Sequence, residues 1–387
     1  MAVWDELTGQ ADAIAIVEAA ASASAIGGSG NSSMTHSWLI TGPPGSGRSN
    51  LAYAFATALL SPGTPEGDAA AARQVAARTH PDLGVLSTER VIIAIEEVRA
   101  LVATSQFSPS VGRYRVMVIE DADRMAERTS NVLLKALEEP PPRTVWILCA
   151  PSEADLIPTI RSRVRTVRLR VPDVAEVAEL LQRRDGVDAA TATRAAREAQ
   201  SHIGMAHRLA TNADARERRE RTLDLALGVR SVSGAVMAAS SLLELAKADA
   251  VAITEQRDSD ERDSALRSLG IEPGGTIPPA LRSQLRNLDD DQKRRATRSL
   301  RDGIDRIMVD LLTLYRDMLL LQLGAPGEPI NVRILDRMQA ASVSCTAVDT
   351  LATMDAIATA RDRIESNVPP ALALEAMLIT AIRRGRA

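Results

Sequence analysis

The residue pattern with the clearest chemistry is a glycine-rich loop at residues 42–49, which follows the apolar run Ser37–Ile40. Its frame is G-x-x-x-x-G-K-[ST], but Arg48 stands where a nucleoside triphosphatase carries lysine. Such a loop turns its backbone N–H groups inward and, with the N-terminus of the next helix, forms a hole for the β-phosphate. The residues predicted to bind nucleotide here are Gly42, Pro43, Pro44, Gly45, Ser46, Gly47, Arg48 and Ser49.

The last two loop positions decide which chemistry remains. A lysine would reach the β- and γ-phosphate oxygens, and Ser49 would bind Mg²⁺. Arg48 keeps the positive charge but brings a wider planar fork on a longer stem, so the replacement is not conservative. The loop therefore predicts weak binding of ATP or ADP, with Mg²⁺ as an optional companion, at a site whose hydrolytic part is altered.

A second candidate group follows the apolar run Arg115–Ile119, which predicts a strand ending at Glu120 and Asp121. Ligands sit at the carboxyl ends of strands in open α/β sheets. In a hydrolytic site the first carboxylate holds Mg²⁺ through water and the second polarises the attacking water, so Glu120 and Asp121 are the candidates in that order. The second is one methylene short of a glutamate, a misplacement that can cost about a hundredfold in rate. Alternatively, these carboxylates and Asp123 simply cap the strand and the next helix.

Composition limits the class of protein. The 387 residues are enough for two or three domains, and 45% hydrophobic with 25% charged residues is ordinary for a globular protein. Aromatic residues make up 2%, which favours helical cores of Ala, Leu, Val and Ile. No apolar run approaches the roughly 20 residues of a membrane span, and the first residues lack the pattern of a signal peptide. A net charge of −4 argues against coating nucleic acid unaided, and two cysteines favour the cytoplasm over a disulfide framework.

The order of the elements predicts three parts. Residues 1–171 read as an α/β domain, a parallel sheet with helices on both faces, because apolar runs alternate with helical patterns. Residues 172–213 predict three short helices of a lid, and residues 214–387 predict an all-α collar. Gly27–Ser33 is expected to be a flexible insertion and Gly270–Pro279 a surface loop. The predicted strands are Ser37–Ile40, Val91–Ile93, Arg115–Ile119, Thr144–Leu148 and Thr166–Val171.

Two further segments carry a family resemblance. With the glycine-rich loop and the acidic strand end, Asn131–Pro141 and Ile160–Arg163 occur in the order typical of AAA+ modules, and they resemble the clamp-loader branch. Its Ser-Arg-Cys motif corresponds to Ser162-Arg163-Val164. The finer resemblance is to the bacterial delta-prime branch of DNA polymerase III clamp-loader subunits, of the actinobacterial kind. It rests on the glycine-rich loop and on Val3–Gln10, His80–Leu83, Ile119–Arg124 and Asn367–Glu375.

The resemblance implies roles for residues and partners. Arg163, with Ser162, would be an arginine finger that reaches the ATP of a neighbouring subunit, and His207 or Arg208 would hold the lid's sensor position. The implied partners are the gamma/tau and delta subunits, the sliding clamp and primer–template DNA, the last through backbone phosphates. No membrane is expected. The chain would work in the cytoplasmic, nucleoid-associated replisome, within a polymerase complex but with no polymerase chemistry of its own.

Departures from the family and alternative interpretations remain. The family's zinc module needs four cysteines, but Ser61–Thr79 has none, so we expect no zinc. The sensor position after the fourth strand falls at Ala150–Pro151, where no side chain donates a hydrogen bond, which predicts a weak ATPase or none. Arg163 could instead be a structural arginine that pairs with Glu138 or Glu139. The whole chain could also be a gamma/tau-like motor with its own ATPase, or an AAA+ branch-migration or repair helicase.

Overall fold

The computed structural model describes residues 4, 7–25, 34–87, 92–268 and 282–382. The predicted insertion Gly27–Ser33 and the predicted loop Gly270–Pro279 lie outside these described residues. The chain divides into two compact units, Met1–Thr211 and Asn212–Ala387. Each unit has its own buried core.

The first unit contains the predicted parallel sheet. Its strand order is β2–β3–β4–β1–β5, and every neighbouring pair is parallel. The α/β architecture expected from the alternating pattern is thereby confirmed. The strands are β1 (Ser37–Thr41), β2 (Leu83–Leu86), β3 (Arg115–Ile119), β4 (Thr144–Ala150) and β5 (Arg165–Arg168).

One strand prediction was wrong. The run Val91–Ile93 does not form a strand over the part that the structure describes, and the strand beside β3 is β2 instead. Ile93 is buried against the neighbouring helices, and its N–H donates to the Arg124 carbonyl at 3.0 Å. Ile93 is therefore apolar because it is buried in the core, although it does not pair with a neighbouring strand.

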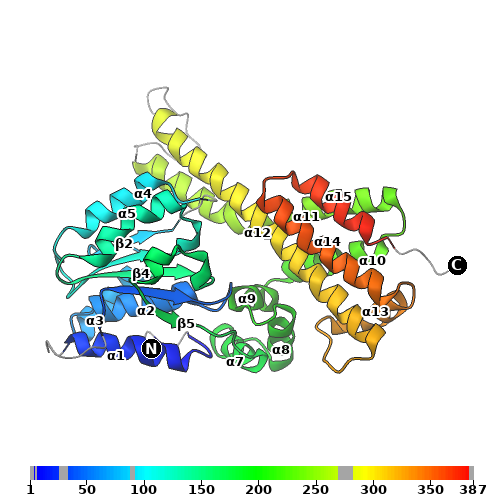
Figure 1. Cartoon of the computed structure of the whole chain (residues 1–387), viewed down its shortest axis with the longest axis horizontal. Coiled ribbons are helices and arrows are strands. Elements are labelled where there is room, and N and C mark those ends of the chain that lie inside the picture. The colour runs from blue at the N-terminus through cyan, green and yellow to red at the C-terminus, as the bar shows by residue number, and fades with distance from the viewer. Residues whose placement is uncertain (1–3, 5–6, 26–33, 88–91, 269–281, 383–387) are drawn as a thin grey trace. The chain divides into compact units, whose positions relative to one another are not determined.

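Side chains alternate across the sheet, as strand geometry requires. In β1, Trp38 and Ile40 pack toward helices α1 (Ala11–Ala25) and α2 (Arg48–Leu60). Leu39 packs with the core under helices α4 (Ile95–Ser105) and α5 (Glu127–Glu138). Figure 1 shows these two helical layers on opposite sides of the sheet. Both faces are thus covered, which is why β1, β3 and β4 are buried along their whole length.

Nine helices occur in the described part of the first unit. Their bounds are α1 (Ala11–Ala25), α2 (Arg48–Leu60), α3 (Pro65–Ala76), α4 (Ile95–Ser105), α5 (Glu127–Glu138), α6 (Pro158–Arg161), α7 (Val174–Asp185), α8 (Ala189–Glu198) and α9 (Ile203–Thr211). Short 3₁₀ turns lie at Ala122–Arg124 and Glu153–Asp155. Helix α5 ends just before Pro140, because proline lacks the N–H that would continue it.

The second unit is helical throughout its described residues. Its helices are α10 (Ala213–Gly228), α11 (Val232–Ser268), α12 (Arg282–Leu323), α13 (Leu335–Ser342), α14 (Ala347–Glu365) and α15 (Pro370–Thr380), with a 3₁₀ turn at Val332–Ile334. Helix α12 buries Ile304, Met308, Leu311, Tyr315 and Met318 on one stripe, the face predicted from their helical spacing. The Asn212 side chain accepts a hydrogen bond from the Ala215 N–H at 3.0 Å and so caps α10 at its start.

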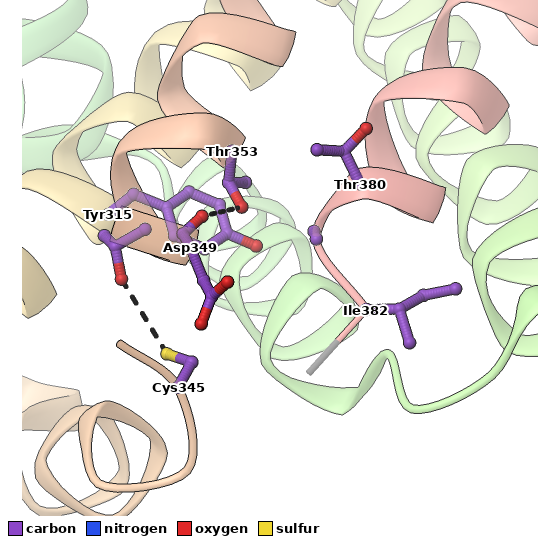
Figure 2. Close-up of a pocket in the computed structure, with 8 residues that line it drawn as sticks. Tyr315, Cys345, Asp349, Thr353, Thr380 and Ile382 are labelled. Carbon is purple, nitrogen blue, oxygen red and sulfur yellow. Dashed lines mark hydrogen bonds between the residues drawn. The ribbon is translucent and has the colours of Figure 1, made fainter. Parts of the chain in front are cut away.

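A small hollow in the second unit offers little room for a ligand. Its volume is about 10 Å³, roughly enough for one water molecule. Figure 2 shows side chains that line it. The hollow is lined by Tyr315, Cys345, Asp349, Thr350, Thr353, Thr380, Ala381 and Ile382. None of the helices in the described residues combines the length and apolar character needed to cross a bilayer.

Candidate functional site

The glycine-rich loop joins the carboxyl end of β1 to the start of α2, the position expected for a phosphate-binding loop. Gly45 and Gly47 have φ of +80° and +92°, in the left-handed region that glycine adopts without strain. At Gly42, a Cβ atom would lie 2.8 Å from the Leu169 Cβ, so that position requires glycine for close approach. The turn geometry predicted from the glycine spacing is therefore present.

The loop presents unpaired donors, which suits an anion. The first hydrogen bond of α2 runs from the Leu51 N–H to the Gly47 carbonyl at 2.9 Å, so the preceding N–H groups of the helix have no partner within it. The Ser46 side chain is 2% exposed, and its hydroxyl meets no hydrogen-bond partner among the described residues. A phosphate in the loop would supply an acceptor for such groups.

Arg48 folds back onto its own loop. One of its guanidinium nitrogens donates to the carbonyl oxygen of Gly42, across the mouth of the turn. Beneath it, the thiol of Cys149 in β4 faces the Arg48 carbonyl at 3.9 Å, and burial raises the pKa of that thiol above its ordinary value. Arg48 thus keeps a positive charge at the loop in a geometry different from that of a lysine reaching outward.

Glu120 follows β3 and is engaged by three side chains. The phenol of Tyr53 donates to Oε1, the Arg78 Nη2 lies 2.8 Å from the same oxygen, and the Ser49 hydroxyl lies 3.5 Å from Oε2. The Arg78 guanidinium also lies 5.2 Å from the ring centroid of Tyr53. Burial, together with the hydrogen bond to Glu120, raises the pKa of Tyr53, so this phenol stays neutral and acts as the donor.

The other two acidic residues face a different set of groups. Asp121 lies 4.0 Å from the Arg124 guanidinium, one turn further along. Burial raises the pKa of Asp123, with the negative charge of Asp121 adding to the effect and the cations Arg124 and Arg48 opposing it. The structure therefore brings Glu120 and Ser49 together, and it places the Arg48 charge within electrostatic reach of Asp123.

The residues do not fit a magnesium ion bound as in a hydrolytic site. Mg²⁺ needs oxygen ligands in near-octahedral arrangement at short distance. Ser49 and Glu120 supply such oxygens, but Glu120 Oε1 already accepts from Tyr53 and pairs with the Arg78 guanidinium. The carboxylate that follows β3 is thus already matched by a side-chain cation.

The predicted sensor residues occupy separate places. Ala150 ends β4, and the Pro151 carbonyl accepts from the Gly42 N–H at 3.2 Å, so this segment supports the loop through its backbone. On α9, the His207 Nδ1 lies 2.8 Å from the Asp185 carboxylate. The hydrogen bond from Arg184, and to a smaller extent that of His207, lowers the pKa of Asp185. Arg208, the alternative sensor, is partly exposed on the same helix.

The start of α9 touches the loop through a residue that the sequence did not suggest. A Cβ on Gly45 would lie 2.3 Å from the His202 ring, and the Ile203 N–H donates to the Gly45 carbonyl at 3.4 Å. His202 has no motif around it that would have predicted this contact. Tyr53 and Arg78 were missed for the same reason, since each comes from a helix or turn without a recognisable pattern.

The predicted finger residue lies at the exposed end of α6. The Arg163 Nε donates to Glu138 Oε1 at 2.5 Å, and Nη1 donates to the Thr159 carbonyl at 2.8 Å and to the Ser162 hydroxyl at 3.0 Å. The side chain is 32% exposed. The structural pairing that we considered for Arg163 is thus present with Glu138, and the side chain is also accessible from outside.

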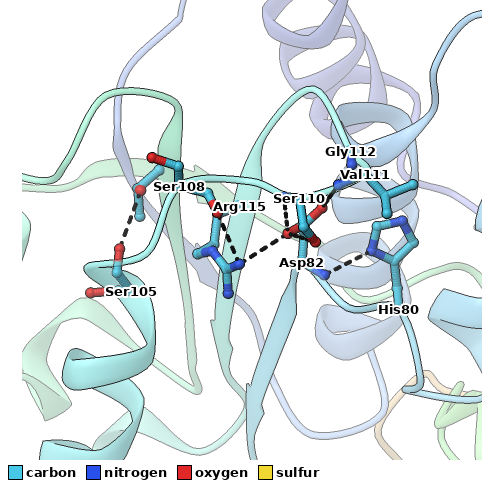
Figure 3. A network of polar contacts seen from close by, with 9 residues as sticks. His80, Asp82, Ser105, Ser108, Ser110, Val111, Gly112 and Arg115 are labelled. Carbon is cyan, nitrogen blue, oxygen red and sulfur yellow. Dashed lines mark hydrogen bonds and ion pairs between the residues drawn. The ribbon is translucent and has the colours of Figure 1, made fainter.

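A buried network fixes the opposite edge of the sheet, where β2 and β3 begin (Figure 3). The fully buried Asp82 carboxylate accepts from the N–H groups of Ser110, Val111 and Gly112, each at 2.7 Å, and from Arg115 at 3.0 Å. Burial acts to raise the pKa of Asp82, but these hydrogen bonds outweigh it and hold the pKa below its ordinary value. The network is structural, because it lies at the strand ends away from the loop.

No group of three or more His, Cys, Asp or Glu side chains is placed to hold a metal ion within the ranges that the structure describes. The sites that remain are therefore the loop with its neighbouring side chains, and the surface around Arg163.

Comparisons with known proteins agree on the first unit. Residues 27–173 match the family model described as "DNA polymerase III, delta subunit". The subunit delta' of Pseudomonas aeruginosa is 34% identical over 160 residues, which is 40% of this chain and 49% of that protein. The subunit delta' of Escherichia coli is 31% identical over 144 residues, 35% of this chain and 43% of that protein.

More distant matches are of other kinds. The subunit tau/gamma of Haemophilus influenzae is 28% identical over 150 residues, 38% of this chain and 22% of that protein. Among solved structures, a gamma subunit-related protein from Thermotoga maritima matches at 18% identity with a TM-score of 0.38, over 90% of this chain and 94% of that chain. This likeness is too weak to assign a function.

The matched segment coincides with the domain that carries the loop, the acidic strand end and Arg163. The chain spans about half the length of the curated delta' relatives that it matches. Residues 27–173 of this chain are therefore similar to the delta' subunits of DNA polymerase III.

Proposed function

We propose that this chain is a delta-prime-type subunit of a replicative clamp loader, one that helps to load the sliding clamp on primed DNA. In this role it presents Arg163, supported by Ser162, to the ATP bound by a neighbouring motor subunit. Its own loop holds a nucleotide weakly and hydrolyses it slowly or not at all. The chain contributes no polymerase chemistry to the DNA polymerase III complex in which it works.

The single observation that carries this proposal is the position of Arg163 in a domain of the delta-prime type. Arg163 stands at the end of the short helix α6 with its guanidinium partly exposed. A guanidinium supplied from outside to a γ-phosphate neutralises charge that develops in the transition state, which is worth about a thousandfold or more in rate. An exposed position is what such a role needs.

The loop region supports the second half of the proposal. Arg48 donates to Gly42 within its own loop, and Glu120 Oε1 is engaged by Tyr53 and Arg78. Ala150 and Pro151 have no side chain that could hydrogen-bond to a γ-phosphate. Phosphate binding by the backbone remains feasible, whereas Glu120, the carboxylate expected to hold Mg²⁺, is already engaged by Tyr53 and Arg78.

The remaining assignments also belong to this proposal. The boundaries 1–171, 172–213 and 214–387 correspond to a nucleotide-binding-type domain, a lid and a collar that joins sister subunits. The partners are the gamma/tau and delta subunits, the sliding clamp, and the primer–template through its phosphates. His207 or Arg208 occupies the sensor position of the lid, and the complex works at the cytoplasmic nucleoid.

The test is the ATPase rate of the purified motor subunits with the delta subunit, clamp and primed DNA. It is run with the wild-type chain, with Arg163→Ala and with Arg48→Ala. Loss of rate with Arg163→Ala alone is the expected result. Loss with Arg48→Ala alone would show a working nucleotide site in this chain, and indifference to both variants would leave only a structural role.

A gamma/tau-like motor is the second candidate, favoured by the 28% identity to the tau/gamma subunit. It predicts steady ATP turnover by the isolated chain that Glu120→Ala abolishes. Under the delta-prime proposal the isolated chain shows little or no turnover, so Glu120→Ala has little to remove. A branch-migration or repair helicase would instead form homohexamers, which light scattering of the isolated chain would detect.

A further inference from the structure

The segment between α2 and β2 delivers one side chain to the candidate site. Helix α3 ends at Ala76, and Arg78 follows with φ of +58°, in the left-handed region. Its N–H donates to the Val75 carbonyl at 2.9 Å, and the Thr79 N–H donates to the Gln74 carbonyl at 2.8 Å. A residue other than glycine is strained in the left-handed region, and such strain often accompanies a functional position.

The left-handed turn directs Arg78 onto the acidic strand end. Its Nη2 lies 2.8 Å from Glu120 Oε1, and its guanidinium packs over Tyr53, whose phenol donates to the same oxygen. The Ser49 hydroxyl, the other expected magnesium ligand, lies 3.5 Å from Glu120 Oε2. The carboxylate that would help to hold a divalent cation is therefore matched by a guanidinium from the same chain.

We propose that Arg78 takes the place of the divalent cation beside the glycine-rich loop, so that the loop binds a nucleoside di- or triphosphate without Mg²⁺. This inference rests on the nucleotide binding contained in the proposed function. Glu120 unpaired would repel phosphate, and Arg78 cancels that charge. Ser46, buried without a hydrogen-bond partner in the described residues, and the free N–H groups at the start of α2 receive the phosphate. In this proposal the cysteine-free segment 61–79 serves to bring Arg78 to Glu120.

The test measures binding of ATP to the full chain by calorimetry, once with Mg²⁺ and once with EDTA. For the wild type we expect the dissociation constants of ATP with Mg²⁺ and with EDTA to agree within about twofold. The reason is that the partly exposed Arg78 guanidinium already neutralises Glu120. Arg78→Gln should weaken binding in EDTA by about tenfold and restore most of it with Mg²⁺. Arg78→Lys should stay closer to the wild type because it keeps the charge.

Arg73→Gln is the matched control, because Arg73 is an exposed arginine on α3 in the same segment. It should leave both constants unchanged. Circular dichroism shows whether Arg78→Gln is folded, and if it is not, the comparison uses Arg78→Lys, whose smaller contact area should give a weaker shift of the same sign. Mn²⁺ binding followed by electron paramagnetic resonance gives a second readout: Arg78→Gln with ATP should bind Mn²⁺ more tightly than the wild type does.

Three outcomes would overturn the inference. These are a wild type that needs Mg²⁺ for ATP, an Arg78→Gln variant that stays indifferent to Mg²⁺, and a wild type that binds no ATP under either condition. None of these outcomes bears on the arginine-finger role of Arg163, which is tested by the ATPase rate of the motor subunits. Conversely, loss of the finger role would leave Mg²⁺-independent binding intact, so the two failures are distinguishable.

Discussion

Arg163 and Glu138 form an ion pair that joins the end of α6 to the last turn of α5, with the Arg163 Nε 2.5 Å from Glu138 Oε1. Both side chains are partly exposed, at 32% and 45%. A pair of this kind contributes little to folding because water and salt screen it. The pair therefore orients a guanidinium that a neighbouring phosphate could take over.

The first prediction concerns stability at this pair. We expect Arg163→Ala to change the free energy of unfolding of the first unit by less than about 1 kcal/mol. Urea unfolding followed by tryptophan fluorescence measures it, because Trp38 and Trp146 both lie in the core of this unit. Glu138→Gln is the control and should have an equally small effect. A loss of about 3 kcal/mol or more would mark Arg163 as a structural residue.

The second prediction concerns the buried carboxylate under the loop Ser108–Gly112. Asp82→Asn should destabilise the first unit by about 3–5 kcal/mol, because Arg115 would be left buried without its counter-charge. The same fluorescence-detected unfolding measures this loss. Glu153→Gln, which removes an exposed ion pair with Arg168, should cost under about 1 kcal/mol. Equal effects of the two variants would contradict the structural role given to Asp82.

The third prediction is a dependence of stability on pH. Burial lowers the pKa of His80 below its ordinary 6.5, and its Nδ1 accepts from the Asp82 N–H at 3.1 Å. The unfolded chain therefore takes up this proton at higher pH than the folded chain does. The stabilisation is complete above about pH 6.5 and is lost as pH falls through the lower folded pKa.

Unfolding of His80→Gln should accordingly vary less between pH 7 and pH 5, as a series of urea titrations would show. An unchanged slope in His80→Gln would assign the pH dependence to other groups.

The fourth prediction concerns the contact between the loop and α9. Gly45→Ala introduces a Cβ at φ +80° and 2.3 Å from the His202 ring, which should cost about 1–3 kcal/mol. In a His202→Ala background the steric part disappears, so the cost should fall while the backbone strain remains. Fluorescence-detected unfolding of the single and double variants gives the difference. An identical cost in both backgrounds would show that His202 does not press on Gly45.

The fifth prediction restores the lysine of a hydrolytic loop. Arg48→Lys should yield no measurable ATP turnover by the isolated chain, because Glu120 remains bound by Tyr53 and Arg78. A coupled assay of phosphate release measures it. Appreciable turnover would show that Arg48 alone disables the site and would favour the motor-like alternative.

Much of the first unit was predictable from local pattern. The strands β1 and β3 follow from apolar runs bounded by polar residues, and the start of α2 follows from the glycine spacing of the loop. Strand β2 was missed because Leu83–Leu86 is short and contains Gly84, whereas the run Val91–Ile93 has the stronger β-propensity. Tertiary pairing overrode propensity at both places.

The site was predictable only where a motif carries it. The loop residues, Glu120 and Arg163 stand in recognisable frames, and their surroundings were found only in three dimensions. Arg78, Tyr53 and His202 reach the site from a turn, from the middle of a helix and from the start of another. Since each contact joins residues far apart in the chain, no local spacing could reveal it.

Because Gly45 and Gly47 adopt left-handed conformations, the phosphate-binding shape of the loop does not depend on the side chain that catalysis would need. Its donors are main-chain groups, whose directions are fixed by Gly45 and Gly47 rather than by the side chain at position 48. Exchange of that side chain can therefore abolish catalysis and leave the shape of the phosphate cradle unchanged. In a loop built this way, the time that a nucleotide stays bound is set by the rate of its release and not by the rate of its hydrolysis.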